Sequence, residues 1–283
     1  MKNSTFLTVV SNTCSESELK PLIEVARANN GHLSVLVLGP APQLPYSAGF
    51  SPYRAAAFPN EWKENFLAES QALSEKVEKL ETLLQSEAIS GDVMAINCEP
   101  SLIPDTVAQR AMVCDLLIVT SEFRAAGDNF IRTIYGVLFG SPIGVIINGT
   151  KNEAAMKANR VFVAWNTGLP ATRAIQQAMP ILRQAQEVTV GIFDPVMTEY
   201  LDGENPGSDL AKWLSRHGCN VQVNQYPSGG KEIGECIISR AKETGADLVV
   251  MGAYGHTRLR EAIFGGTTRT LINQEDLAVL LAH

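Results

Sequence analysis

The sequence predicts an α/β protein built from two tandem units, each a five-stranded parallel sheet with helices on both faces. Three observations lead to this fold class. One order of apolar segments occurs twice along the 283 residues, the segments are short continuous runs of Val, Ile and Leu, and amphipathic stretches separate them. Continuous apolar runs that alternate with helices are typical of parallel strands buried on both faces.

The first strand of each unit shows the repeat most clearly. Leu7–Thr13 and Val161–Thr167 are both apolar runs that end in Asn-Thr, and they lie 154 residues apart. A helix is expected after each run. The first begins at Ser15, whose spacing to Glu18 is that of a capping box, and the second begins near Pro170, since proline suits the first helical position.

Three further strand pairs keep the same order. They are expected at 33–37 and 188–192, at 115–119 and 247–251, and at 143–147 and 277–281, with offsets of 155, 132 and 134 residues. A long amphipathic helix is expected over 66–84, because Phe66, Leu73, Val77, Leu80 and Leu84 recur at helical spacing.

The fall in the offset means that the first unit holds about 23 extra residues between its second and fourth strands. Segment 40–62 is rich in proline and aromatic residues, which favours a long ordered loop over a linker. The repeat pattern breaks near 148–159. We therefore expect one domain over 1–150, with this insertion, and a second over 151–283.

Composition excludes several classes of protein. Hydrophobic residues make up 45% and charged residues 19% of the chain, as in an ordinary globular protein and unlike a disordered or collagen-like one. The net charge of −7 favours neither nucleic acid nor an anionic membrane as a partner. No apolar stretch approaches the ~20 residues of a membrane span, so a cytoplasmic protein is expected.

The five cysteines and four histidines form no metal or disulfide pattern. A metal site at His217 and Cys219 is set aside because further ligands are missing. The turn 228–231 (Ser-Gly-Gly-Lys) has neither the first Gly nor the final Ser/Thr of a P-loop, since Gln225 and Glu232 stand there. We expect a plain turn before a helix over 233–241.

One set of ordered glycines is a candidate ligand loop. Gly252, Gly255 and Gly265 follow the fourth strand of the second unit, and Gly266, Thr267 and Thr268 open the next helix. Glycines at such a turn let backbone N–H groups approach an anion, and a helix N-terminus adds the positive end of its dipole. Arg258, Arg260 and Arg269 lie within or beside the loop, although arginines there are more often surface residues.

These residues resemble the universal stress protein family, in particular its tandem two-domain members. The family pattern Gly-x2-Gly-x9-Gly, followed by Ser or Thr, is matched by Gly252, Gly255 and Gly265. The resemblance implies a Rossmann-like fold of the adenine nucleotide alpha hydrolase type in each domain, binding of ATP or a related adenine nucleotide, with or without Mg²⁺, and pairing of the two domains. A homodimer of the chain stays open as an alternative.

The chain departs from the family pattern at several positions. Gly266 stands where Ser or Thr is expected, and Asn166, with Thr167 beside it, stands where nucleotide-binding members carry Asp. In the first unit, Thr120 and Phe123 replace the first two glycines. We therefore expect nucleotide binding in the second domain alone.

Three functions compete at this point. The first is a stress-associated regulatory protein that binds nucleotide through Asn166, Thr167, Gly252, Gly255, His256, Gly265, Gly266, Thr267 and Thr268. The alternative is a non-nucleotide interaction module of the same fold whose partner surface involves 40–62. The third, an ATP-consuming enzyme, is the weakest, because no residue is assigned a catalytic role and His256 has no orienting partner.

Overall fold

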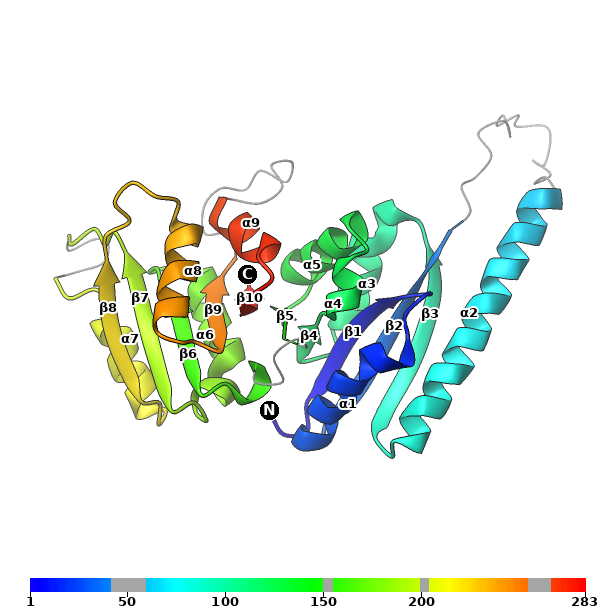
Figure 1. The fold of residues 1–283 in the computed structure, drawn as a ribbon, viewed down its shortest axis with the longest axis horizontal. Coiled ribbons are helices and arrows are strands. Elements are labelled where there is room, and N and C mark those ends of the chain that lie inside the picture. Colours follow the sequence, from blue (N-terminus) through cyan, green and yellow to red (C-terminus); the bar gives the residue numbers. More distant parts are fainter. Residues whose placement is uncertain (42–59, 150–154, 199–203, 254–265) are drawn as a thin grey trace.

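The computed structural model describes residues 1–41, 60–149, 155–198, 204–253 and 266–283. Within them, ten strands form one sheet in the order β3-β2-β1-β4-β5-β10-β9-β6-β7-β8 (Figure 1). The strands are β1 Thr5–Ser11, β2 His32–Pro40, β3 Ser90–Cys98, β4 Leu116–Ile118, β5 Gly144–Ile147, β6 Arg160–Ala164, β7 Glu187–Phe193, β8 Val221–Tyr226, β9 Leu248–Gly252 and β10 Ala278–Ala282. The predicted α/β fold class is confirmed.

Helices cover both faces of the sheet because the central strands are apolar on both sides. The α-helices are α1 Glu16–Asn29, α2 Asn60–Ser86, α3 Ile103–Ala111, α4 Ser121–Arg124, α5 Asp128–Gly140, α6 Leu169–Leu182, α7 Ser208–Arg216, α8 Ile233–Glu243 and α9 Gly266–Asn273, and Pro100–Leu102 (η1) and Ala155–Lys157 (η2) are short 3₁₀ turns. One core cluster holds buried residues of α1, α2, α6 and α7, and the other holds those of α3, α5, α8 and α9.

The sheet consists of two halves with the same internal order. Strands β1–β5 form the first half and β6–β10 the second, and in each half the first strand lies between the second and the fourth. An aspartate repeats at the same place in both. Asp115 accepts a hydrogen bond from the backbone N–H of Thr5, and Asp247 accepts from those of Asn159 and Arg160, so each ties its fourth strand to the start of its first.

The two halves join edge to edge. Strand β10 pairs with β5 in the antiparallel sense, with Leu280 opposite Ile146, whereas the other strand pairs are parallel. Both central strands are fully buried at these positions. The expected boundary at 150/151 falls on residues 150–154, which lie outside the described residues, so it stays a prediction.

The halves differ most between their second and third strands. Helix α2 has 27 residues and its counterpart α7 has 9, so most of the extra length of the first half is helical. The segment expected as an ordered loop, 40–62, ends inside this helix, because Asn60 is its first residue. Its middle part, 42–59, lies outside the described residues.

Candidate functional site

The candidate site lies where the chain direction reverses in the second half. Helix α6 leads from β6 outward to β7, whereas α9 leads from β9 inward to β10, and ligands of open parallel sheets bind at the carboxyl ends of strands beside such a switch point. Strands β6 and β9 are paired neighbours, with Ala164 opposite Met251. Asn166 and Thr167 follow β6 after Trp165, and Gly252 ends β9, so the fold brings these predicted residues to one place.

Gly252 has a packing role that the sequence did not reveal. A Cβ atom added there would lie 2.4 Å from the backbone nitrogen of Ala171 and 2.6 Å from the carbonyl carbon of Pro170. These atoms belong to the first turn of α6, so only glycine lets the helix start approach the strand end so closely. Gly252 therefore sets the distance between β9 and the N-terminus of α6.

Asn166 and Thr167 are exposed at this N-terminus. The backbone N–H of Gly168, the N-cap of α6, donates to the backbone oxygen of Asn166 at 2.7 Å. The side-chain oxygen of Asn166 lies 3.1 Å from where a Cβ of Gly168 would stand, so the amide lies over the helix start. An amide both donates and accepts hydrogen bonds and carries no charge, unlike the aspartate of the family pattern.

Helix α9 begins with three of the predicted residues. Gly266 is exposed, Thr267 is half-buried and Thr268 is buried. Gly266 and Thr267 are therefore the residues of this helix N-terminus that a ligand can reach. Gly255, His256 and Gly265 lie outside the described residues, as do Arg258 and Arg260, so their place at the site stays a prediction.

A carboxylate that sequence reasoning missed lies beside this helix start. The side chain of Glu232 caps α8 by accepting the backbone N–H of Glu235 at 3.2 Å. Its other oxygen, Oε1, would lie 3.5 Å from a Cβ built on Gly266. In the sequence, Glu232 served only to exclude a P-loop, and nothing in the pattern predicted that α8 and α9 would begin side by side.

In the first half, the corresponding place is filled by side chains. Thr120 stands at the end of β4 and caps the short helix α4, accepting the N–H of Phe123 at 3.1 Å. Phe123 is buried in the core. The predicted loss of the glycine loop in this half thus takes the form of a helical turn packed against the core.

Thr120 also donates a hydrogen bond to the carboxylate of Glu18, which is buried. Burial is the largest effect on this carboxyl group and raises its pKa, while the Thr120 hydrogen bond and Lys76 oppose the shift. The predicted capping box at Ser15 and Glu18 is therefore wrong. Ser15 is the N-cap residue but its side chain makes no capping bond, because Glu18 turns inward to Thr120.

In the first half, the next helix after this turn is α5. Helix α5 starts at Asp128, whereas Ile131 and Arg132, which align with Gly265 and Gly266 in sequence, lie in its interior. Asp128 is an acidic residue in the first turn of α5.

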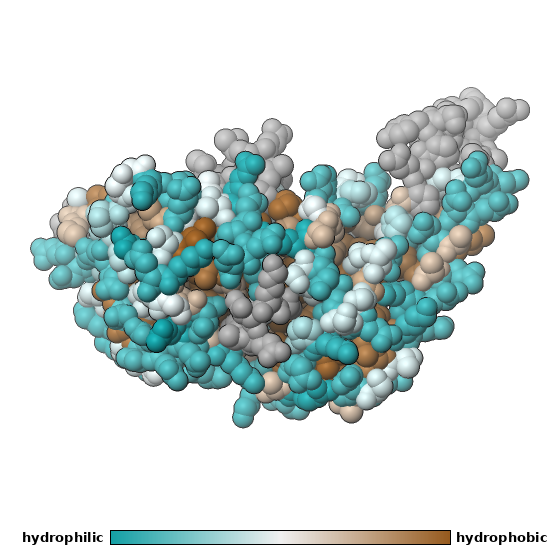
Figure 2. Space-filling view, in the orientation of Figure 1, coloured by the Kyte–Doolittle hydropathy of each residue, from teal (hydrophilic) through white to brown (hydrophobic). Residues whose placement is uncertain are grey.

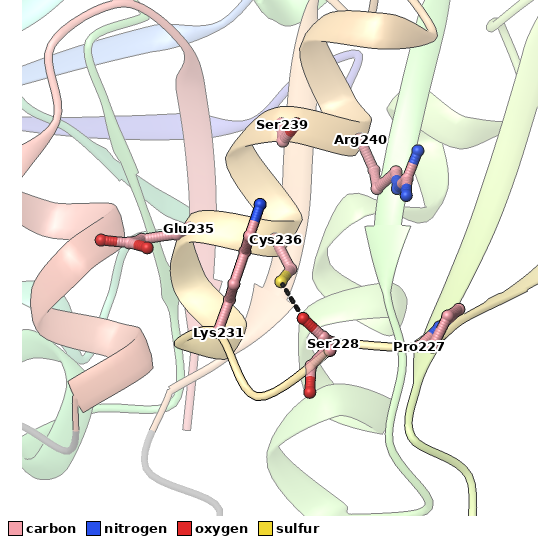
Figure 3. Close-up of a pocket in the computed structure, with 8 residues that line it drawn as sticks. Pro227, Ser228, Lys231, Glu235, Cys236, Ser239 and Arg240 are labelled. Atoms are coloured by element: carbon pink, nitrogen blue, oxygen red, sulfur yellow. Dashed lines mark hydrogen bonds between the residues drawn. The ribbon is translucent and has the colours of Figure 1, made fainter.

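A surface pocket follows β8 at the Ser-Gly-Gly-Lys turn (Figure 3). Gly229 and Gly230 both have positive φ, as a tight turn requires, and the thiol of Cys236 donates weakly to the carbonyl of Ser228 at 3.8 Å. Arg240 is paired with Glu243 and stacks over Tyr226. The segment is a turn before α8, as predicted.

Other chemical groups are distributed as follows. Within the described parts of the chain, no cluster of three or more His, Cys, Asp or Glu side chains is arranged to hold a metal ion. The five cysteines are free, and only Cys236 is not buried. Burial raises the pKa of the Cys14 thiol and raises that of Cys114 to about 11, which makes both poor nucleophiles.

No helix in the described ranges has the length and apolarity to cross a membrane.

Two doubly wound halves sharing one sheet, with a glycine at the switch point of the second, define a tandem α/β protein. Residues 228–283 match the sequence model of the Universal stress protein family. No curated protein matches the chain in sequence.

Solved structures match the fold over nearly its whole length. A universal stress protein from Archaeoglobus fulgidus DSM 4304 has a TM-score of 0.61 at 14% identity, covering 98% of this chain and 95% of its own. A putative universal stress protein from Pseudomonas aeruginosa UCBPP-PA14 has 0.54 at 17% identity, covering 99% and 93%. A functionally unknown protein from P. aeruginosa PAO1 has 0.55 at 15%, covering 99% and 92%. The chain is thus a tandem protein with the universal stress protein fold, and its family resemblance is confirmed.

Proposed function

We propose that the second half binds ATP or a related adenine nucleotide, in a regulatory rather than catalytic role in a stress response. The observation that carries the proposal is the position of the glycine pattern in the fold. Gly252 ends β9 at the switch point, and Gly266 opens α9, the next helix, as a phosphate-binding loop requires.

The site has the parts that a nucleotide needs. Two helix N-termini, those of α6 and α9, supply backbone N–H groups and positive dipole ends. The exposed amide of Asn166 and hydroxyl of Thr167 offer hydrogen-bonding groups for a ribose or base. Side chains fill the matching place in the first half, which supports a single site per chain.

Glu232 favours the magnesium form of the nucleotide. A carboxylate close to the first residue of α9 repels free phosphate, but it attracts a cation that the phosphates share. Mg²⁺ is commonly held by one or two carboxylates together with nucleotide phosphates. We therefore propose Mg·ATP rather than free ATP as the ligand, with Glu232 facing the cation.

The first test is direct. Freshly purified protein is denatured and the released small molecules are identified by mass spectrometry, and nucleotide-free protein is titrated with ATP and Mg²⁺ in a calorimeter. One equivalent of adenine nucleotide per chain is expected. Failure to release any nucleotide, together with no binding at millimolar Mg·ATP, would contradict the proposal, and two equivalents would contradict the assignment to one half.

A second candidate function is an interaction module whose partner surface involves 40–62. One observation favours it: in the first turns of α2 the side chains are exposed or half-buried, and the first buried residue of the helix is Leu73. Phe66 and Leu67 are exposed there, and Figure 2 shows apolar surface over α2 at the right of the molecule. Deletion of 40–59 should then abolish partner capture without changing nucleotide binding, and an unchanged set of captured partners would count against it.

A further inference from the structure

The C-terminus of α9 is held by the first half of the chain. Arg124, the last residue of α4, donates hydrogen bonds from its guanidinium to the backbone oxygens of Ile272 and Gln274, the latter at 3.1 Å. Asn148, which follows β5, accepts from Arg124 at 3.0 Å and donates to the oxygens of Gln274 and Leu277 at 2.9 and 3.1 Å. These two side chains thus bind the Ile272 carbonyl in the last turn of α9 and two carbonyls of the turn into β10.

The guanidinium of Arg124 is largely shielded from solvent and is restrained by contacts on several sides. Its side chain is only 15% exposed, its Nε lies 3.5 Å from the Glu275 carboxylate, and its guanidinium carbon lies 5.2 Å from the centre of the Phe130 ring. A buried guanidinium is tolerated only where its donors are satisfied. Here one acceptor is the carbonyl of Ile272 in the last turn of α9, and two more belong to Gln274 and Glu275 directly after the helix, so the arginine and the helix end depend on one another.

The two ends of α9 therefore face different halves of the molecule. Its N-terminus is part of the proposed nucleotide site, and its C-terminus lies on Arg124. A cation at the C-terminus and an anion at the N-terminus both interact favourably with the helix dipole. With 8 residues, the helix is about 12 Å long, so holding one end also restricts the other.

We propose that Arg124 is a positioning residue for the nucleotide site of the second half. By fixing the C-terminus of α9, it orders and orients the helix whose first residues receive the phosphates. The first half has no glycine loop of its own, and the turn that replaced that loop, Thr120–Arg124, completes the site of its neighbour. This inference rests on the proposed function.

The test compares ATP with adenosine, because Arg124 acts through the phosphate end of the site alone. In Arg124→Met, the affinity for Mg·ATP measured by calorimetry should fall about tenfold, as expected for losing a partly buried charge at a helix end. The affinity for adenosine should change less than about twofold. Arg124→Lys, which keeps the charge but loses the forked geometry, should recover part of the ATP affinity.

Arg110→Met is the matched control. Arg110 is also a partly buried arginine of the first half, but it binds Asp92 and Ser34 and touches no residue of α9. It should leave both affinities unchanged. Equal losses for ATP and adenosine in Arg124→Met, or no loss for either, would overturn the proposal.

Amide hydrogen exchange separates this proposal from the proposed function. Exchange of residues 266–273 should be faster in Arg124→Met than in the wild type or Arg110→Met, with or without ligand. Wild-type protein that binds no nucleotide overturns the proposed function and, with it, the role of Arg124 in the site. If exchange of residues 266–273 is unchanged in Arg124→Met, then Arg124 does not restrain α9, whether or not the protein binds nucleotide.

Discussion

Gly252 and Gly266 belong to one sequence pattern, but glycine suits each position for a different physical reason. An added Cβ at Gly252 meets the backbone of α6, whereas one at Gly266 meets, among the described residues, the carboxylate of Glu232 at an ordinary contact distance. The first glycine is required for packing between a strand and a helix. The second leaves the start of α9 accessible.

Gly252→Ala should therefore be destabilising. The clash is with backbone atoms that cannot rotate away, so a loss of about 1–3 kcal/mol in the free energy of unfolding is expected from chemical denaturation. Gly266→Ala is the matched control and should change stability by less than about 0.5 kcal/mol. Similar stabilities of the two variants would mean that the close approach of β9 to α6 is incorrect.

Glu18→Gln should stabilise the protein, increasingly so at higher pH. Burial raises the pKa of Glu18 above its ordinary value of 4.5, so between these two values the folded state binds more protons than the unfolded chain. The stability of the wild type therefore falls as pH rises through this window, and the penalty persists above it. Glutamine carries no charge and keeps an acceptor for Thr120.

Denaturation at several pH values from 4 to 8 measures the effect. The two proteins should be alike near pH 4 and should differ by about 1 kcal/mol at neutral pH, the scale of one buried polar group. Glu16→Gln, an exposed change in the same helical turn, is the control and should show no such trend. A Glu18→Gln protein less stable than the wild type at neutral pH would refute the interpretation.

At the scale of elements, four of the five strands in each half were predictable, because each is a short apolar run with a matching copy. Strands β3 and β8 mix polar with apolar residues and were not among the matched pairs. The helix lengths were harder to predict from the sequence. Segment 40–62 has a composition typical of loops, yet residues 60–62 already belong to α2. The contacts between helix ends, such as Glu232 beside Gly266, could not be predicted, because they join residues more than thirty positions apart with no pattern between them.

Glu232→Gln tests the meeting of α8 and α9. Glutamine retains an oxygen that can cap α8 but removes the negative charge beside the start of α9. The affinity for ATP without magnesium should rise severalfold, since a repulsion is lost, whereas the affinity for Mg·ATP should fall, since the cation loses a carboxylate. Calorimetry in EDTA and in magnesium distinguishes the two. Loss of affinity in EDTA would contradict the placement of phosphate near Glu232.

At the scale of the molecule, the repeat predicted two copies of one unit. In the sheet, these copies meet through two strands with fully buried apolar residues. Strands β5 and β10 bury Val145, Ile146, Val279, Leu280 and Leu281 completely. Neither half could expose this edge to water without a large apolar surface. The apolar strands could be predicted from the sequence, but the antiparallel pairing of β5 with β10 could not. The spacing of residues along the chain does not indicate which strands of the two halves pair.

The chain should therefore unfold as one cooperative unit. Thermal unfolding followed by circular dichroism and by tryptophan fluorescence should give coincident single transitions. Leu280→Ala should lower the midpoint while keeping one transition, because a cavity at the join costs about 2–5 kcal/mol shared by both halves. Two separated transitions, with only one of them moved by the substitution, would show that the halves are thermodynamically independent.

The antiparallel join also has a genetic consequence. In a pair of identical subunits, every substitution appears twice, so a change that helps one copy at the expense of the other has no way to persist. Within a single polypeptide, each copy mutates alone. The first half can therefore carry Thr120 and Phe123 at the positions where the second half carries Gly252 and Gly255.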